Sequence, residues 1–370
     1  MLYFKRMEQK KVKYINVDNL HYSFRAIRGY QKPINIILSA REPGKTSSFW
    51  REIAYKQYYE RGMKGILMVR QTVEISVQLI DDIENEINKF LSPSDQIKFE
   101  YKESSFTSGI VDVSINGDLF FRIVSLSIKM VRLKKMKVPK CGWIVQDEFI
   151  IDPRTKEKYL TNEMMRIKEL YTTNIRTRFS EDEPIYQYYL GNPYSLFNPL
   201  FVDLGVDTSK LKIGEKYVGK GFVIDFYKMK PELREHILKI NPFYQFDEDY
   251  KAYALEGKAI NDTNLKVSNV MPSGYVLKFI CRFEGIYIGI FMSKELFYED
   301  YYYAREIPKN YGSNKASYAF DFKELVNGTT LFNSIDRSQF TLFKRAIEKR
   351  KITYETITIA YYIQEIYNYL

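Results

Sequence analysis

The sequence is poor in the residues that build metal sites and covalent cross-links. Its 370 residues include only two cysteines, Cys141 and Cys281, and two histidines, His21 and His236. So few residues cannot form a disulfide framework, a zinc ribbon or a histidine-rich metal centre. We therefore expect a reduced, cytosolic protein whose chemistry uses carboxylates, hydroxyls and cations.

Long apolar runs are missing as well. No stretch approaches the roughly eighteen residues of a membrane span, and charges interrupt the N-terminal MLYFKRMEQKKVKY too often for a signal peptide. The chain instead carries a formal net charge of +10 and many rings, with 32 Tyr and 25 Phe. The rings predict aromatic cores. The charge favours nucleic acid as a partner, and we expect no association with a membrane.

Short apolar runs alternate with helical stretches over the first half of the chain. This alternation predicts an α/β domain with a mainly parallel sheet, whose ligands bind at the carboxyl ends of the strands. The runs expected to form strands are residues 34–38, 65–69, 119–124, 143–146 and 185–190.

The second half has a different texture. Residues 205–220 are polar, and GFVIDFY at 221–227 reads as a strand. VLKFICRFEGIYIGIFM at 276–292 predicts a β-hairpin around Glu284-Gly285, and residues 337–369 predict helix. We expect a first domain over 1–204, a linker region over 205–247 and a second domain over 248–370.

The segment INIILSAREPGKTSSFW, residues 34–50, has the layout of a phosphate-binding loop (P-loop). In such a loop backbone N–H groups and a helix N-terminus surround the phosphates of ATP, the lysine reaches them, and the hydroxyl binds Mg²⁺. Ser39 replaces the first glycine of the pattern G-x-x-x-x-G-K-[ST]. The predicted ATP-binding residues are Ser39, Ala40, Arg41, Glu42, Pro43, Gly44, Lys45, Thr46 and Ser47, with Thr46 also a ligand of Mg²⁺.

Two further strands end in polar residues. CGWIVQDEF at 141–149 predicts that Asp147 holds Mg²⁺ through water and that Glu148 is the general base for an attacking water. Gln146 interrupts the apolar run of this motif. After IYQYYL, Asn192 is either a sensor of the terminal phosphate or part of an ordinary Asn-Pro turn.

Two basic segments are candidates for contacts outside the nucleotide pocket, one with a neighbouring subunit and one with DNA. NIRTR at 174–178 either supplies an arginine to a neighbouring subunit or is a solvated turn. SIKMVRLKKMKVPK at 127–140 either grips DNA phosphates or is a solvated basic loop. The candidate DNA-binding residues of this second segment are Lys129, Arg132, Lys134, Lys135 and Lys137.

Together these segments resemble the DNA-packaging ATPases of phi-29-like tailed phages, which are small relatives of the terminase large subunits. The resemblance spans most of the chain and is carried by SAREPGKT, LMVRQ at 67–71, WIVQDEFI, YLTNE at 159–163, IRTR, YLGNPYSLFNPLF at 189–201 and FICRFEGIYIGIF. It implies an ASCE-type P-loop ATPase domain followed by an α+β RNase H-like domain that has lost nuclease activity. It also implies that Lys45 and Glu148 are catalytic, with Arg176 as a trans-acting arginine finger and Arg178 as its substitute.

The resemblance further implies an ATP-driven translocase that packages double-stranded DNA into a preformed capsid. It would work as a homo-oligomeric ring, of five subunits in the family, at the capsid portal. This places it in the host cytoplasm, at the procapsid portal vertex, and outside the mature virion. Whether a structural RNA takes part is left open.

Two other classes of protein share some of these features. A terminase that keeps its endonuclease activity needs several carboxylates at the ends of central strands, and residues 276–283 contain no acid. A nucleoside kinase or nucleotide-switched binding module has a P-loop, but small kinases generally lack a water-activating residue such as Glu148 and need no second domain.

Overall fold

The computed structural model falls into two compact units. One unit comprises Met1–Pro199 and Thr208–Ile260, and the other Leu200–Asp207 and Asn261–Leu370. None of the helices among the described residues is long and apolar enough to cross a membrane. The described residues are 11–152, 155, 157–175, 185–194, 198–246, 251, 255, 266–294, 302–312, 314–320, 324–332, 340–349 and 351–367.

The first unit is built on a nine-stranded sheet with the order β3-β4-β5-β2-β6-β7-β1-β9-β8. The six strands from β5 to β9 in this order pair in parallel, as expected. All five predicted apolar runs are confirmed as strands. The strands are β1 (Ile34–Leu38), β2 (Lys64–Val69), β3 (Phe99–Glu100), β4 (Ile110–Ile115), β5 (Asp118–Ser125), β6 (Cys141–Asp147), β7 (Tyr186–Gly191), β8 (Lys216–Val218) and β9 (Phe222–Phe226).

The segment expected to be a linker, residues 205–247, contributes to this sheet. Its strand β9 pairs in parallel with β1, the strand that leads into the P-loop, and β8 pairs with β9. The expected boundary at residue 204 therefore lies too early for the sheet. All five residues of β9 are buried. The polar residues 205–220 that precede it led to the prediction of a linker, so the end of the first domain was placed before this strand. Helices α8 (Pro231–Ile240) and α9 (Phe243–Phe246) follow.

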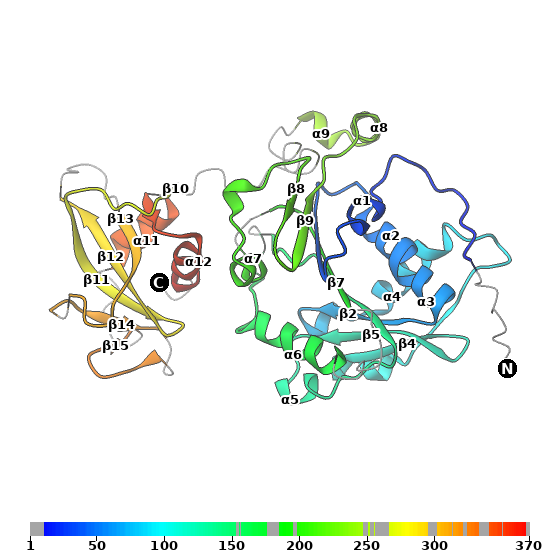
Figure 1. The fold of residues 1–370 in the computed structure, drawn as a ribbon, viewed down its shortest axis with the longest axis horizontal. Helices are drawn as coiled ribbons and strands as arrows, with labels where there is room; N and C mark the ends of the chain where they lie inside the picture. The colour runs from blue at the N-terminus through cyan, green and yellow to red at the C-terminus, as the bar shows by residue number, and fades with distance from the viewer. Residues whose placement is uncertain are drawn as a thin grey trace, which may run out of the picture. The chain divides into compact units, whose positions relative to one another are not determined.

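Helices cover both faces of the sheet (Figure 1). The P-loop helix runs without a break through α2 (Lys45–Phe49), a π-helical segment η1 (Trp50–Tyr55) and α3 (Lys56–Arg61). Together with α4 (Val77–Asn88) it lies on one face, and α6 (Glu163–Ile175) lies on the other. The shorter helices of the unit are α1 (Arg25–Arg28), η2 (Thr72–Glu74), η3 (Glu103–Ser108), α5 (Met130–Leu133) and η4 (Thr208–Lys210).

Much of the core beneath the P-loop helix is aromatic. The ring of Phe49 meets those of Trp50 and Trp143 edge-on, with centroids 5.4 and 5.3 Å apart, and Trp50 also packs on Phe121 at 5.0 Å. Edge-to-face contacts of this kind add about 0.5–1.5 kcal/mol per pair beyond the buried area. They fix the P-loop helix against the strands that carry the other site residues.

The second unit contains a seven-stranded sheet with the order β10-β16-β13-β12-β11-β14-β15. The predicted hairpin is confirmed: β11 and β12 are antiparallel and join at Glu284-Gly285, both with positive φ. β13 is antiparallel to β12, and β14 runs parallel to β11. This arrangement agrees with the expected RNase H-like fold. The elements are α7 (Pro199–Leu204), β10 (Lys266–Val267), β11 (Tyr275–Phe283), β12 (Ile286–Ser293), β13 (Tyr302–Ile307), β14 (Ser317–Ala319) and β15 (Thr330–Leu331).

The end of the chain is less uniformly helical than predicted. Helices α11 (Thr341–Glu348) and α12 (Ile357–Tyr367) are separated by β16 (Ile352–Tyr354), which pairs with β10 and β13. A strand of three residues is too short to be recognised from a periodic pattern.

The contact between Gly65 and Trp143 gives a test of the packing under the P-loop helix. A methyl group on Gly65 would lie 2.0 Å from the indole of Trp143, and this ring cannot move away because Phe49 and Trp50 enclose it. We expect Gly65→Ala to lower the free energy of unfolding by about 2–3 kcal/mol, measured by urea denaturation. Gly221→Ala is the matched control, since nothing lies within 4 Å of its added methyl group. Equal stability of the two variants would contradict this packing.

Candidate functional site

The loop from Ser39 to Gly44 has the backbone of a phosphate cradle. Gly44 has a φ of 72°, in the left-handed region, and α2 begins at the next residue. Gly44 is also packed against a side chain: a Cβ there would lie 3.0 Å from Cδ2 of His21. The carboxylate of Asp18 holds that imidazole at 2.8 Å. Gly44 is therefore required by its conformation, and a Cβ there would also press on His21, whose place beside the loop was not apparent from the sequence.

Ser39 fits the position where the P-loop pattern has its first glycine. Among the described residues it is not one of those with positive φ, so its backbone does not need glycine. The side chain is fully buried, and its hydroxyl donates to the carbonyl of Ala40 at 2.9 Å. The departure from the pattern therefore leaves the cradle intact.

Lys45 is buried at the start of α2 and points to the end of β7. Its Nζ donates to Oδ1 of Asn192 at 2.7 Å and lies 3.4 Å from the carbonyl of Ala40. Burial lowers the pKa of Lys45 to about 8, while the charges of Asp147 and Glu148 act in the opposite direction. Asn192 is thus placed directly at the lysine that would hold a terminal phosphate.

Thr46 and Asp147 form the second pair of the site. The hydroxyl of Thr46 donates to Oδ2 of Asp147 at 2.6 Å. Burial raises the pKa of Asp147, and the hydrogen bond from Thr46 partly offsets this. A hydroxyl, one carboxylate and substrate phosphates are a typical ligand set for Mg²⁺, which keeps several waters. These oxygen ligands therefore fit the ion that the sequence implies. Among the described residues, no group of three or more His, Cys, Asp or Glu is placed so that it could hold a metal ion by itself.

Glu148 follows directly and is held in an unusual backbone conformation. Its φ is 52°, and its N–H donates to Oδ1 of Asp147 at 2.9 Å. Partial burial of the carboxyl and the negative charge of Asp147 raise the pKa of Glu148, while Lys45 and Arg41 lower it. A non-glycine residue with positive φ costs free energy and is found disproportionately at functional sites.

Arg41 is connected to the same site through Tyr194. Its Nε and Nη2 donate to the hydroxyl of Tyr194 at 3.1 and 2.9 Å, and Nδ2 of Asn192 donates to the same oxygen at 3.2 Å. Arg41, Asn192 and Lys45 therefore form one hydrogen-bonded chain. This position of Tyr194 was not predicted from the sequence.

The last two residues of the predicted ATP-binding segment, Thr46 and Ser47, border an open cavity. A cavity of about 760 Å³ is lined by Thr46 and Ser47 and by polar residues of α4. The hydroxyl of Ser47 donates to Glu86 of that helix. Ala40 and Pro43 are buried and Glu42 is exposed; the Pro43 carbonyl accepts from the N–H of Tyr22 at 2.8 Å.

A buried ion pair next to Glu148 was not predicted. Nε of Arg70, at the end of β2, lies 3.0 Å from Oε2 of Glu163, and its Nη2 donates to the carbonyl of Phe149 at 2.8 Å. Glu163 also accepts from the N–H of Leu160 at 2.9 Å. Both side chains are buried, so each charge depends on the other. The turn after Glu148 is thereby attached to the first residue of α6.

The predicted DNA-binding segment is attached to the same helix. Nη1 of Arg166 donates to the carbonyls of Leu126 and Ile128, both at 2.9 Å. Asn174 donates to the carbonyl of Met136 and accepts from the N–H of Val138, both at 2.8 Å. The backbone of the segment is thus held at both ends, while its five predicted cations are exposed: Lys129, Arg132, Lys134, Lys135 and Lys137.

Two predicted residues are not seen. Arg176 and Arg178 lie outside the described residues, which stop at Ile175, the last residue of α6, and resume at Ile185.

The second unit presents an arginine and a glutamate at the end of its central hairpin. Nη1 of Arg282 donates to the carbonyl of Glu324, and the two side chains lie 3.8 Å apart. Oε2 of Glu324 accepts from the N–H of Gly285 at 3.2 Å. The carboxylate of Glu324 is thus held between Arg282 and the backbone of the hairpin turn.

Comparison with known proteins finds structural relatives only. No protein-family model and no curated protein matches the sequence. The fold is similar to that of the bacteriophage Phi-29 viral genome packaging motor assembly, with 17% identity, a TM-score of 0.64, and coverage of 95% of this chain and 99% of that one. It is also similar to the Phi-28 gp11 DNA packaging motor, with 16% identity, a TM-score of 0.61, and coverage of 95% and 98%. The structural resemblance expected from the motifs is thereby confirmed over nearly the whole chain.

The pKa of Lys45 gives a test of the predicted phosphate contact. A bound phosphate favours the charged ammonium, so the affinity should be constant below the free-protein pKa of about 8 and fall as the pH rises above it. We expect the dissociation constant of ADP, measured calorimetrically at fixed Mg²⁺, to rise by up to about tenfold per pH unit above pH 8. Lys45→Arg keeps its charge at these pH values and should give a flat profile, although binding is weaker. A wild-type profile as flat as that of the variant would remove Lys45 from the phosphate contact.

Proposed function

We propose that this protein is an ATPase that moves double-stranded DNA into a preformed capsid. The observation that carries the proposal is the convergence of the P-loop, Asp147-Glu148 and Asn192 at one edge of a single parallel sheet. Similarity to two structures of packaging motors over nearly the full chain supports it. The net charge of +10 is consistent with a nucleic-acid partner.

The geometry supplies the groups that ATP hydrolysis needs. Lys45 and the backbone of the loop would hold the phosphates, and Thr46 and Asp147 would hold Mg²⁺, which neutralises charge on the phosphate oxygens. Binding of the ion and the nucleotide would replace the present pairs, Thr46 with Asp147 and Lys45 with Asn192. Glu148 would accept a proton from the attacking water, a role suited by its raised pKa. The open cavity beside Ser47 offers room for the sugar and base.

Coupling of hydrolysis to DNA would run through α6. Its first residue, Glu163, is bound to Arg70, which also holds the carbonyl of Phe149, next to Glu148. Its side chains Arg166 and Asn174 hold the basic segment. A displacement at Glu148 would therefore be transmitted to the segment as a movement of one rigid helix. The exposed cations would contact phosphates without reading sequence, as a packager of any DNA requires.

The working form is proposed to be a ring. Arg176, which follows α6 directly in the sequence, would reach the nucleotide of a neighbouring subunit, with Arg178 as its substitute. We propose a homo-oligomer, of five subunits by resemblance, docked on the capsid portal in the host cytoplasm and absent from the mature virion.

The second unit is proposed to have kept the fold of a nuclease without its activity. β11 contains no acid along its length, Tyr275–Phe283, and Glu324 is satisfied by Arg282 and by the N–H of Gly285. These observations favour a packager without endonuclease activity over a cutting terminase.

Removal of the proposed general base is the direct test of the ATPase. We expect Glu148→Gln to lower DNA-stimulated ATP hydrolysis by at least about 100-fold, with ADP affinity changed less than about threefold, because the glutamine keeps the size of the side chain. Hydrolysis is measured by phosphate release and binding by calorimetry. Wild-type protein whose hydrolysis is absent, or is indifferent to DNA, would exclude a motor.

The same variant tests the shared site. Arg176→Ala subunits retain Glu148, and Glu148→Gln subunits retain Arg176, so each complements the other at mixed interfaces. We expect a mixture of the two inactive proteins to recover part of the wild-type activity. A mixture as inactive as its components would contradict a finger supplied in trans.

The basic segment is tested by the salt dependence of DNA binding. Each phosphate contact contributes a slope of about −0.9 to the plot of log affinity against log salt. The double variant Lys134→Gln, Lys135→Gln should therefore reduce the slope by as much as about 1.8, measured by fluorescence anisotropy. The control is Lys212→Gln with Lys220→Gln, two exposed lysines near β8, which should leave the slope unchanged. Equal slopes for both double variants would exclude the segment as a DNA contact.

A further inference from the structure

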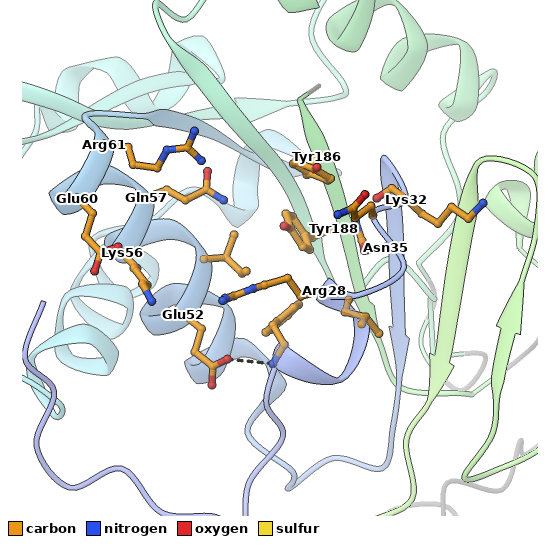
Figure 2. Close-up of a pocket in the computed structure, with 14 residues that line it drawn as sticks. Arg28, Lys32, Asn35, Glu52, Lys56, Gln57, Glu60, Arg61, Tyr186 and Tyr188 are labelled. Carbon is orange, nitrogen blue, oxygen red and sulfur yellow. Dashed lines mark hydrogen bonds between the residues drawn. The ribbon is translucent and has the colours of Figure 1, made fainter. Parts of the chain in front are cut away.

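A second cavity lies at the amino-terminal ends of the strands, whereas the P-loop lies at their carboxyl ends. Its volume is about 390 Å³, within the range of small-molecule sites. Three elements line it: the chain around α1, the amino-terminal ends of β1 and β7, and one side of the P-loop helix beyond its first turns (Figure 2). None of residues 39–47 takes part, so this cavity is separate from the proposed nucleotide site.

The wall provided by the P-loop helix begins in its π-helical segment. Glu52 and Ile53 of η1 line the cavity, as do Lys56 and Gln57 of α3, one turn further. Residues four apart lie on the same side of a helix, so these side chains form two adjacent rows. π-helical turns inside α-helices occur frequently at functional sites. The helix that carries Lys45 at its start therefore presents a second polar face at its other end.

The acids of this cavity already have partners. Oε2 of Glu52 accepts from the N–H of Phe24 and the hydroxyl of Ser23, at 3.1 and 3.0 Å, and its Oε1 accepts from Arg51 at 2.8 Å. Glu60 accepts from the N–H of Val12 at 3.3 Å. The negative charges are thus used to hold the surrounding chain in place.

Two of the cations have no such partner. The side chains of Arg28 and Lys56 form no hydrogen bond or ion pair with any residue that the structure describes. Figure 2 shows the side chain of Arg28 extending from α1 toward the helix that carries Lys56. Two cations directed into one cavity repel each other unless an anion lies between them, and hydrogen bonds from cations to phosphate or carboxylate are among the strongest in proteins.

An aromatic wall stands opposite the helix. Tyr186 and Tyr188 of β7 both line the cavity. Tyr188 is buried and packs against Phe24 and Phe49, with centroids 5.6 and 5.2 Å apart, so this wall is rigid. Tyr186 is half-buried, so part of its side chain remains accessible to a ligand. Aromatic side chains stack well on planar bases.

From these features we propose that the cavity is a second ligand site, which takes a small phosphate-bearing anion with a planar ring, of the size of a nucleoside monophosphate. Arg28 and Lys56 would bind the phosphate, and Tyr186 would stack on the ring. The modest volume of about 390 Å³ favours a small molecule over a peptide segment of a partner protein. The proposed site lies at the amino-terminal ends of the strands, away from the P-loop. Its test is therefore independent of whether the protein hydrolyses ATP.

The test is calorimetric titration of Lys45→Ala protein with AMP and with pyrophosphate, because this background weakens binding at the P-loop. We expect both anions to bind with dissociation constants below about 1 mM. Adding Arg28→Gln or Lys56→Gln should weaken both by at least about tenfold, whereas Arg28→Lys, which keeps the charge, should retain most of the affinity. Adding Tyr186→Leu should weaken AMP but leave pyrophosphate unchanged.

The matched control is Arg25→Gln, which removes an exposed cation of the same helix that does not line the cavity and should change neither affinity. Circular dichroism of each variant verifies folding. No binding to the Lys45→Ala protein, or binding that ignores Arg28 and Lys56, overturns the proposal. Binding of a glutamate-rich peptide in place of both small anions also overturns it, in favour of a protein partner.

Discussion

The candidate site depends on the register of three parallel strands. β7 lies between β1 and β6, with Leu38 opposite Gly191 and Asp147 opposite Leu190. This register brings residues more than a hundred positions apart to one edge, where Lys45 meets Asn192 and Thr46 meets Asp147. A shift of β6 or β7 by one residue would turn the polar side chain at its end, Asp147 or Asn192, to the other face of the sheet and away from the P-loop. The aromatic packing of Phe49, Trp50 and Trp143 maintains the alignment from below.

The residue after Glu148 is connected to helix α6 through Arg70 and Glu163. The carboxyl of Glu148 is placed by a left-handed turn, and the next residue is bound through its carbonyl to Arg70. Since Arg70 and Glu163 are buried together, separating them would leave uncompensated charges in the interior, which is strongly unfavourable. The turn and α6 are therefore expected to move as one body. The basic segment, attached to the same helix by Arg166 and Asn174, would follow.

Much of this arrangement could be predicted from the sequence, because buried parallel strands appear as continuous apolar runs and their polar ends mark the ligand edge. Contacts between side chains that are distant in the sequence could not be predicted in this way. The pairing of Arg70 with Glu163 and the link from Arg41 to Asn192 through Tyr194 leave no local pattern. β9 was recognised as a strand but assigned to a linker, since its pairing with β1 is a tertiary property. The cavity near Arg28 is lined by three separate segments of the chain, and no sequence motif predicts it.

Ser39 has an implication for how such proteins are identified. The backbone at this position does not adopt a conformation reserved for glycine, and its hydroxyl satisfies the adjacent carbonyl internally. Gly44, with its left-handed backbone against His21, has no such latitude. Searches that demand both glycines will overlook sequences of this kind, whereas a pattern anchored on the second glycine, the lysine and the following hydroxyl would retain them. In related sequences we accordingly expect several residue types at the position of Ser39 but almost only glycine at the position of Gly44.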